Sequence, residues 1–184
     1  MLIRRETEAD VAAVREVTAE AFRSMPHSAP PVEPGGPPGE VTLLDKLRTD
    51  PGWMPQLSLV AEGAAGGDDA GSVVGHVVGT RGRVGTAPAV AVGPVSVLPS
   101  HQRRGVGKAL LHAVLAAADA LDEPLVVLLG DPAYYGRFGF RPAAEFGVLP
   151  PDDAWGAYFQ VRTLSAYQPS IVGRFVYATP FDQL

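Results

Sequence analysis

The chain has 184 residues, a formal net charge of −5 and no cysteine. This length is typical of one domain, or of one domain with an appended arm, and the missing cysteines exclude disulfides, thiolate zinc sites and cysteine nucleophiles. The negative charge argues against a nucleic-acid partner. The histidines (His27, His76, His101 and His112) lack ligand spacing, so no protein-built metal centre is expected. No segment has the roughly 20 apolar residues of a membrane span or a signal-peptide core, so the predicted location is cytoplasmic.

The N-terminal part predicts a strand, a helix, a loop and a second helix. Leu2 to Arg5 has the pattern of a short edge strand. Thr7-Glu8-Ala9-Asp10 then forms a capping box that opens a helix reaching about Phe22. Ser24 to Gly39 holds six prolines and three glycines, so it is predicted as a long loop of the kind that is usually functional or disordered. A second helix is expected from about Val41 to Arg48.

Three strands are predicted next, over Leu57 to Glu62, Ser72 to Val84 and Ala89 to Leu98. The glycine-rich residues 63–71 make the hairpin tip between the first two. Gly93-Pro94 interrupts the third strand. Because proline cannot donate to a ladder, a bulge or a splay is expected there.

The C-terminal half predicts a helix over Lys108 to Leu121 and a fully apolar central strand over Leu125 to Leu129. Further strands are expected at three places: Phe140 to Val148, Phe159 to Ala166, and around Ile171 to Tyr177. The pattern is that of a mixed α/β sheet with helices on its faces. We predict a single domain over residues 1–166 and a C-terminal arm over residues 167–184, packed on or extending it.

Candidate chemistry lies between the third strand and the third helix, in Gln102-Arg103-Arg104-Gly105-Val106-Gly107-Lys108. A helix start attracts anions through its unpaired N–H groups and its dipole, and the two glycines let a phosphate approach the backbone. The basic side chains add full positive charge. A phosphate or diphosphate is the predicted ligand, although glycines that serve only a tight turn would give the same pattern. A nucleotide-phosphate domain is a third interpretation, but the Walker A and dinucleotide motifs are both missing.

The Q-x-x-G-x-G pattern of this turn resembles the acyl-coenzyme A signature of the GCN5-related N-acetyltransferase (GNAT) family. A second segment, Asp131-Pro132-Ala133-Tyr134-Tyr135-Gly136-Arg137-Phe138-Gly139-Phe140, resembles the family's Y-x-x-x-G-F element. The likeness is greatest to the uncharacterised bacterial branch with a GDPxYYxRFGF phrase. The two motifs cover about Ala89 to Arg141. A plain aromatic core cluster is the alternative for the second motif.

The resemblance implies an acyl-CoA-dependent N-acyltransferase, here an N-acetyltransferase with acetyl-CoA as cosubstrate. It also implies a mostly antiparallel central sheet with a splayed central strand pair. The backbone from Gln102 to Lys108 would hold the cosubstrate's pyrophosphate, and Val95, Ser96 and Val97 would contact its pantetheine arm. Tyr135 matches the family's catalytic tyrosine, which would contact the cosubstrate and protonate the leaving thiolate. The Val95 N–H would stabilise the oxyanion.

The general base departs from the family pattern, because many members carry Glu or Asp on the splayed strand and Ala89 to Leu98 has neither. His76, on the preceding strand, is the candidate base. A structural His76, a water relay to a distant carboxylate, or an amine that binds already neutral are the alternatives.

The acceptor is expected to be a small-molecule or protein amine, lined by the Ser24 to Gly39 loop and by Pro150 to Tyr158. A non-catalytic acyl-CoA-binding or regulatory module on the same fold is the alternative function. A homodimer is left open.

Overall fold

The computed structural model describes residues 1–26 and 28–183, so His27 and Leu184 lie outside the described residues. One twisted sheet runs through the molecule in the order β1-β2-β3-β4-β5-β8-β6, and β9 pairs with both β3 and β7. Neighbours are antiparallel except for the β4–β5 and β7–β9 pairs. The strands are β1 (Leu2–Arg5), β2 (Trp53–Glu62), β3 (Val73–Val84), β4 (Ala87–Val97), β5 (Leu125–Leu129), β6 (Arg141–Pro142), β7 (Val148–Leu149), β8 (Phe159–Thr163) and β9 (Gly173–Val176). This confirms the predicted fold class.

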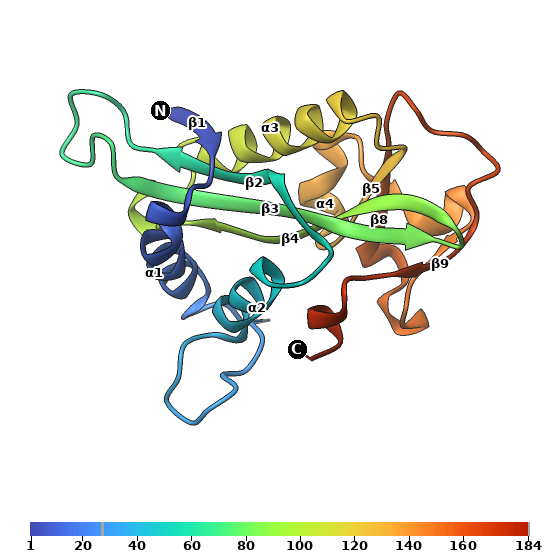
Figure 1. Ribbon diagram of the computed structural model, residues 1–184, viewed down its shortest axis with the longest axis horizontal. Coiled ribbons are helices and arrows are strands. Elements are labelled where there is room, and N and C mark those ends of the chain that lie inside the picture. The colour runs from blue at the N-terminus through green and yellow to red at the C-terminus, as the bar shows by residue number, and fades with distance from the viewer. Residues whose placement is uncertain (27, 184) are drawn as a thin grey trace.

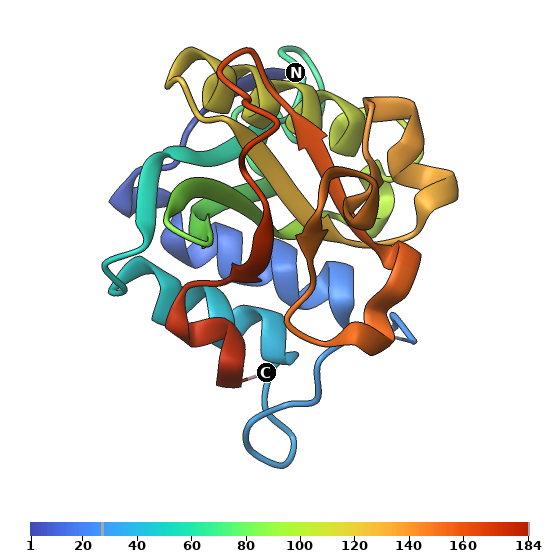
Figure 2. The ribbon, with the colours of Figure 1, turned by 90° about the vertical axis from the view of Figure 1, so that its right-hand side faces the viewer.

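Helices cover both faces of the sheet (Figure 1). They are α1 (Val11–Phe22), α2 (Gly39–Arg48), α3 (Val106–Ala120) and the short α4 (Pro132–Tyr135). The end-on view in Figure 2 shows the sheet between α3 on one side and α1 with α2 on the other. α3 lies on the sheet because its apolar residues recur at helical spacing and are buried: Leu110, Leu111, Val114, Leu115 and Ala118.

The N-terminal prediction is confirmed in detail. The Asp10 carboxylate accepts a 2.8 Å hydrogen bond from the Thr7 backbone N–H, which completes the capping box before α1. A 3₁₀ turn over Glu8–Asp10 precedes the α-helix, and the Arg4 guanidinium holds the same carboxylate at 2.7 and 2.8 Å. Within the described ranges, no helix is long and apolar enough to cross a bilayer.

The expected interruption at Gly93-Pro94 is a bulge. The β3–β4 register shifts there, since Val77 faces Val95 while Gly79 faces Val92. β4 pairs with β5 only through Val90 with Val126 and Ala91 with Val127. Beyond Ala91, then, β4 and β5 no longer pair, and the central sheet is splayed where the sequence predicted it.

The predicted strand over Phe140 to Val148 is wrong. The chain there makes the two-residue β6, a 3₁₀ turn over Ala143–Phe146, and the two-residue β7. Gly147 ends the turn with φ +69°, a left-handed conformation that a strand cannot contain. The alternating apolar residues therefore belong to a compact turn.

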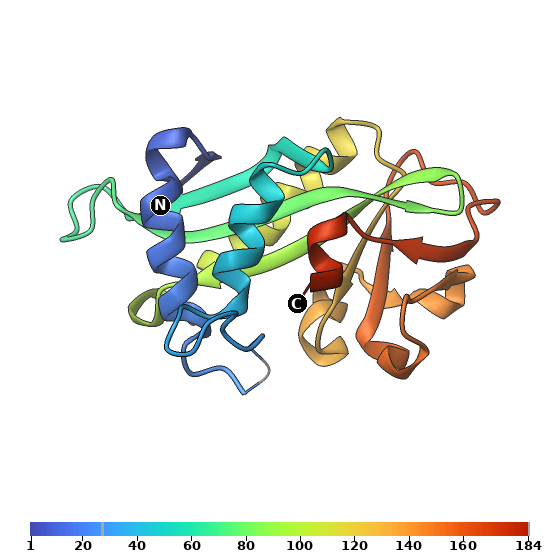
Figure 3. The same cartoon turned by 60° about the horizontal axis from the view of Figure 1, so that its bottom comes forward.

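The C-terminal arm is joined to the sheet through β9, and Phe175 is buried in the core. Its ring lies against Gly82 of β3, where an added Cβ would come within 2.3 Å of Phe175 Cζ. The arm continues into a 3₁₀ helix, Thr179–Gln183, which lies beside α2 in Figure 3. The domain boundary at residue 166 stays a prediction.

Candidate active site

The glycine-rich turn links β4 to α3 through a left-handed bend. A 3₁₀ turn over Pro99–His101 follows the strand, and Arg103 (φ +60°) and Gly105 (φ +88°) then take positive φ values. Gly105 is the residue that caps α3. The Gln102 side chain donates a 3.1 Å hydrogen bond to the Val97 carbonyl, so it fixes the turn to the end of β4. The N–H groups at the start of α3 are thereby held next to the splayed strand.

The surface of this turn fits a diphosphate. Its basic side chains, Arg103, Arg104 and Lys108, are exposed, and none makes a hydrogen bond or ion pair within the described part of the chain. Gly107 leaves space on the same surface, since an added Cβ would lie 3.6 Å from Tyr134 Oη and from Val97 Cγ2. Three free cations beside a helix N-terminus favour an anion of high charge.

The predicted pantetheine residues lie on β4 beyond the bulge. Val95 is half-buried and borders a cavity of about 810 Å³. Ser96 is fully buried, and its hydroxyl is 3.0 Å from Thr18 Oγ1 of α1, so its side chain is occupied inside the protein. Val97, half-buried, uses its carbonyl to hold Gln102. A ligand in the splay could therefore meet the backbone of Ser96 but not its hydroxyl.

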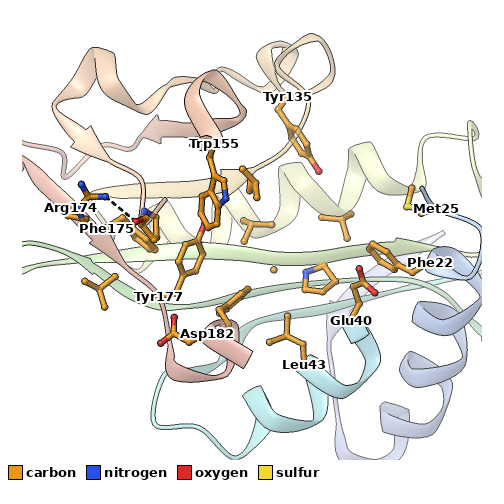
Figure 4. A pocket seen from close by; sticks show the side chains of 18 residues that line it. Phe22, Met25, Glu40, Leu43, Tyr135, Trp155, Arg174, Phe175, Tyr177 and Asp182 are labelled. Atoms are coloured by element: carbon orange, nitrogen blue, oxygen red, sulfur yellow. Dashed lines mark hydrogen bonds between the residues drawn. The ribbon is translucent and has the colours of Figure 1, made fainter. Parts of the chain in front are cut away.

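Tyr135 lines the same cavity from α4, and Figure 4 shows its hydroxyl pointing into it. Its ring lies on Gly130, where an added Cβ would come within 2.2 Å of Tyr135 Cε2. Asp131 caps α4 by accepting a 2.9 Å hydrogen bond from the Ala133 N–H. Burial, with a smaller contribution from Tyr134, raises the pKa of Tyr135 to about 12. The phenol therefore keeps its proton at neutral pH.

Tyr134 faces another direction. It is 37% exposed and does not border the cavity. The Arg137 guanidinium carbon lies over the Tyr134 ring, 4.8 Å from its centroid, and the Tyr134 hydroxyl lies near Gly107. The two neighbouring tyrosines are thus divided between the cavity and the glycine-rich turn.

His76 is buried away from the cavity, on the face of the sheet that α1 and α2 cover. Its cross-strand neighbours are Val60, which packs with α1, and Ser96, which bonds Thr18. His76 Nε2 lies 3.0 Å from Ser58 Oγ and 3.2 Å from Glu6 Oε2. The imidazole is fully buried, and its Nδ1 has no partner among the described residues. The structure does not bring this candidate base to Tyr135 or Val95.

The charges of this cluster explain the protonation state of His76. Burial lowers the pKa of His76, although the Glu6 carboxylate acts against it. For Glu6, burial alone would raise the pKa, but hydrogen bonds from His76 and Ser58 outweigh it and hold the pKa at about 2. Arg48 also pairs with Glu6 at 2.7 Å. His76 is thus a neutral donor to an ionised Glu6.

The cavity next to the splay has a volume of about 810 Å³. The two predicted acceptor segments contribute Met25, Pro151 and Trp155 to its lining. Sequence reasoning missed Glu40 of α2. It also missed the part of the lining that comes from β9, from Tyr177 just after it, and from the last 3₁₀ helix with Asp182. The apolar alternation of β9 was the available signal, but nothing in the sequence indicated that this strand adds to the sheet beside the splay.

Comparison with known proteins decides the family. A family model described as acetyltransferase (GNAT) domain matches residues 2–143. The chain belongs to the GNAT acetyltransferase family. Among curated GNAT relatives, the uncharacterised N-acetyltransferase YhbS of Escherichia coli is 30% identical over 169 residues, covering 90% of this chain and 88% of YhbS. The uncharacterised N-acetyltransferase YjhQ of the same species is 27% identical, covering 94% of this chain and 90% of YjhQ.

Solved GNAT structures agree over nearly the whole chain. E. coli YhbS in complex with CoA superposes with a TM-score of 0.81 at 27% identity, covering 98% of this chain and 91% of that one. A GNAT acetyltransferase from Brucella melitensis in complex with acetyl-CoA gives 0.75 at 33% identity, covering 98% and 97%. Membership of the GNAT family confirms the predicted enzyme class, an acyl-CoA-dependent acetyltransferase that acts on an amine, with acetyl-CoA as cosubstrate.

Proposed function

We propose that acetyl-CoA lies with its diphosphate on the turn from Gln102 to Lys108 and its thioester in the splay of β4 and β5, and that an amine in the adjoining cavity attacks it. One observation carries this proposal. The splayed part of β4 and the free hydroxyl of Tyr135 both border a cavity of about 810 Å³. The cationic turn follows the end of the same strand and leads into α3. The CoA complexes of the GNAT relatives support the same reading.

The reaction needs no protein nucleophile. The amine nitrogen forms a bond to the thioester carbonyl carbon, the tetrahedral intermediate expels the thiolate, and the nitrogen loses a proton. The products are an N-acetyl amine and CoA with a free thiol. A chain without cysteine can perform this direct transfer by positioning both substrates.

Two groups act on the charges that develop. The Val95 N–H, beside the bulge, donates to the oxyanion of the intermediate. Tyr135 gives its proton to the departing sulfur. With the tyrosine pKa at about 12 and that of a free thiol near 8.5, complete transfer is uphill by roughly 3 to 4 pKa units, so Tyr135 acts first as a hydrogen-bond donor to the negative charge on the leaving sulfur.

The first prediction concerns the cosubstrate. Acetyl-CoA should raise the melting temperature of the protein, because a ligand at 100 times its dissociation constant adds about 2.7 kcal/mol of stability. Gly107→Val should weaken binding by roughly tenfold, since the new side chain occupies the surface that the diphosphate approaches. The Cβ of the new valine makes only ordinary van der Waals contacts within the protein, so the fold should be kept. Thermal unfolding with and without acetyl-CoA measures the first effect, and isothermal titration calorimetry measures the second.

Lys108→Ala is the matched comparison, because it removes one exposed charge from the same helical turn and should have a smaller effect. Release of free thiol in the presence of an amine then separates an enzyme from a non-catalytic binder. A folded sample that does not bind acetyl-CoA would refute the proposed function.

The second prediction concerns the proton that the amine loses. His76 does not border the cavity, so we infer that the amine attacks after losing its proton without the help of His76. A plot of kcat/KM against pH should then rise up to the pKa of the acceptor amine. With a less basic amine, this limb should move to lower pH. His76→Gln should keep that limb. An acid limb below about pH 6.5 that disappears in this variant would make His76 the base after all.

The same variant should change stability. The pKa of His76 in the folded state lies below the ordinary value of about 6.5. His76 therefore contributes stability above about pH 6.5. This contribution is lost as the pH falls, because the unfolded chain takes up the proton first. The melting temperature of the wild type should therefore fall between pH 7.5 and 5.5 more than that of His76→Gln. Equal slopes would contradict the neutral, buried His76.

A further inference from the structure

The cavity next to the splay has one wall of aromatic rings. Trp155 and Tyr177 have ring centroids 6.2 Å apart, and Tyr177 and Phe181 have theirs 4.8 Å apart. Figure 4 shows Trp155 and Tyr177 side by side, facing the cavity from the side opposite Glu40 and Phe22. A continuous aromatic wall of this kind favours an apolar body and also attracts cations to its ring faces.

Glu40 brings a carboxylate to the opposite wall. It lies in the first turn of α2 and is 7% exposed. Its two oxygens accept hydrogen bonds from the Ser28 hydroxyl at 2.8 Å and the Ala29 N–H at 2.7 Å, which fixes it beneath the proline-rich loop. Neither partner is a cation, so its negative charge has no neutralising group in those contacts. A carboxylate shielded from water attracts an ammonium group more strongly than an exposed one does.

The remaining charges of the lining point to the same ligand. Asp182, at the end of the aromatic wall, is exposed and has no hydrogen-bond or ion-pair partner within the described residues. Arg174 is the cation of the lining, but its guanidinium is held at a neighbouring turn by the carbonyls of Pro150 and Pro151 and by Asp153. The free charge of the cavity is therefore negative.

The neutral hydrogen-bonding side chains of this lining are few: Tyr135, Trp155 and Tyr177. Among the described residues that border the cavity there is no Ser, Thr, Asn, Gln or His. An amino sugar or a peptide would bury more hydroxyl or amide groups here than these three side chains can pair, which costs about 1–3 kcal/mol for each unmade hydrogen bond. The volume lies in the range of about 300–1,000 Å³ typical of small-molecule sites.

We infer that the acceptor is a small primary amine with an apolar, aromatic body, whose ammonium group is recognised by Glu40. This inference rests on the proposed function, because the cavity must open on the thioester. The amine binds as a cation, with its body along the Trp155–Tyr177–Phe181 wall, and delivers its nitrogen toward Val95 and Tyr135 once it has released its proton to the solvent. Glu40 is then a specificity residue that an amine meets before the chemical step.

The test uses the full chain with saturating acetyl-CoA and reads free thiol. The acceptors are 2-phenylethylamine, spermidine, glucosamine and a lysine-containing peptide. We expect kcat/KM for 2-phenylethylamine to exceed each of the others by about tenfold or more. Equal or faster turnover of any of the other three overturns the inference, as does failure to acetylate 2-phenylethylamine while acetyl-CoA still binds. Loss of acetyl-CoA binding would instead refute the proposed function.

Variants then test the carboxylate. Glu40→Gln should raise KM for 2-phenylethylamine by about tenfold and leave the Kd of acetyl-CoA unchanged. Because Gln also alters the bonds to the loop, Ser28→Ala is the matched control: it removes one loop bond, keeps the charge, and should leave KM within about twofold. An equal effect of both variants, or none from Glu40→Gln, overturns the role of Glu40. In binding with CoA present, the neutral isostere 2-phenylethanol should be about tenfold weaker than the amine, and equal binding would also overturn it.

Discussion

Replacing Tyr135 with phenylalanine should lower kcat by roughly 10²-fold, the usual effect of losing an acid–base group. The ring stays on Gly130 and only the hydroxyl that points into the cavity is removed, so the fold and the Kd of acetyl-CoA should be preserved. Because kcat and kcat/KM should fall together, the lost interaction belongs to the transition state. Steady-state kinetics with a good acceptor, together with calorimetry for acetyl-CoA, measure both.

Tyr134→Phe is the natural control, since it removes a hydroxyl from the adjacent residue but outside the cavity. It should affect kcat less than Tyr135→Phe. With its pKa at about 12, Tyr135 should also add no alkaline limb to the rate profile below about pH 10. If Tyr134→Phe proved the slower enzyme, the acid would be Tyr134, and the cavity would not mark the thioester.

Local patterns predicted several elements around the proposed cosubstrate site. The capping box at Thr7, the apolar run over Leu125 to Leu129 and the break at Gly93-Pro94 each act over a few residues, and the structure has all three. The glycine-rich turn belongs to this class as well, because a helix N-terminus and a left-handed glycine are encoded within a heptapeptide. These are the parts of the site that the sequence alone could define.

The proposed acceptor cavity could not be predicted in the same way, because its walls come from distant parts of the chain. Glu40 lies on α2, whereas Tyr177 follows β9. The pairing of β9 with β3 brings Tyr177 near the splay. The segment from Phe140 to Val148, which was predicted as a strand, shows the same limit. Its apolar residues alternate as in a strand, but Pro142 before the 3₁₀ turn and left-handed Gly147 after it favour a turn.

His76 shows why residue type alone does not place a side chain at a site. A histidine on a strand next to the splay was the best titratable candidate near neutral pH. Strand alternation decides which face a side chain takes, and here it directs His76 to α1 and α2, where Glu6 and Ser58 fill its hydrogen-bonding capacity at Nε2. The partners lie on β2 and just after β1, far away in sequence, so the cluster appears only in the folded chain.

Gly130→Ala should be nearly as harmful as losing the hydroxyl itself, with kcat reduced by roughly 10²-fold. An alanine Cβ would lie 2.2, 2.7 and 3.2 Å from three carbons of the Tyr135 ring. The first two distances are too short for non-bonded carbon atoms, so the ring cannot stay where it is. The ring must move off the backbone, and its hydroxyl leaves the place from which it reaches the leaving sulfur. Because Gly130 has no reactive group, its effect can only act through Tyr135 and the α4 turn.

A double-mutant cycle tests that reasoning. In Gly130→Ala/Tyr135→Phe the displaced ring has no hydroxyl to lose, so kcat should be no lower than in Tyr135→Phe alone. Gly136→Ala, also at α4, is the control: an added Cβ there has no neighbour within 4 Å and φ is −55°, so kcat should be unchanged. Independent, multiplying effects of the two substitutions would mean that Gly130 matters for the turn as a whole, and that the position of the Tyr135 hydroxyl is not set by the contact between this ring and the glycine.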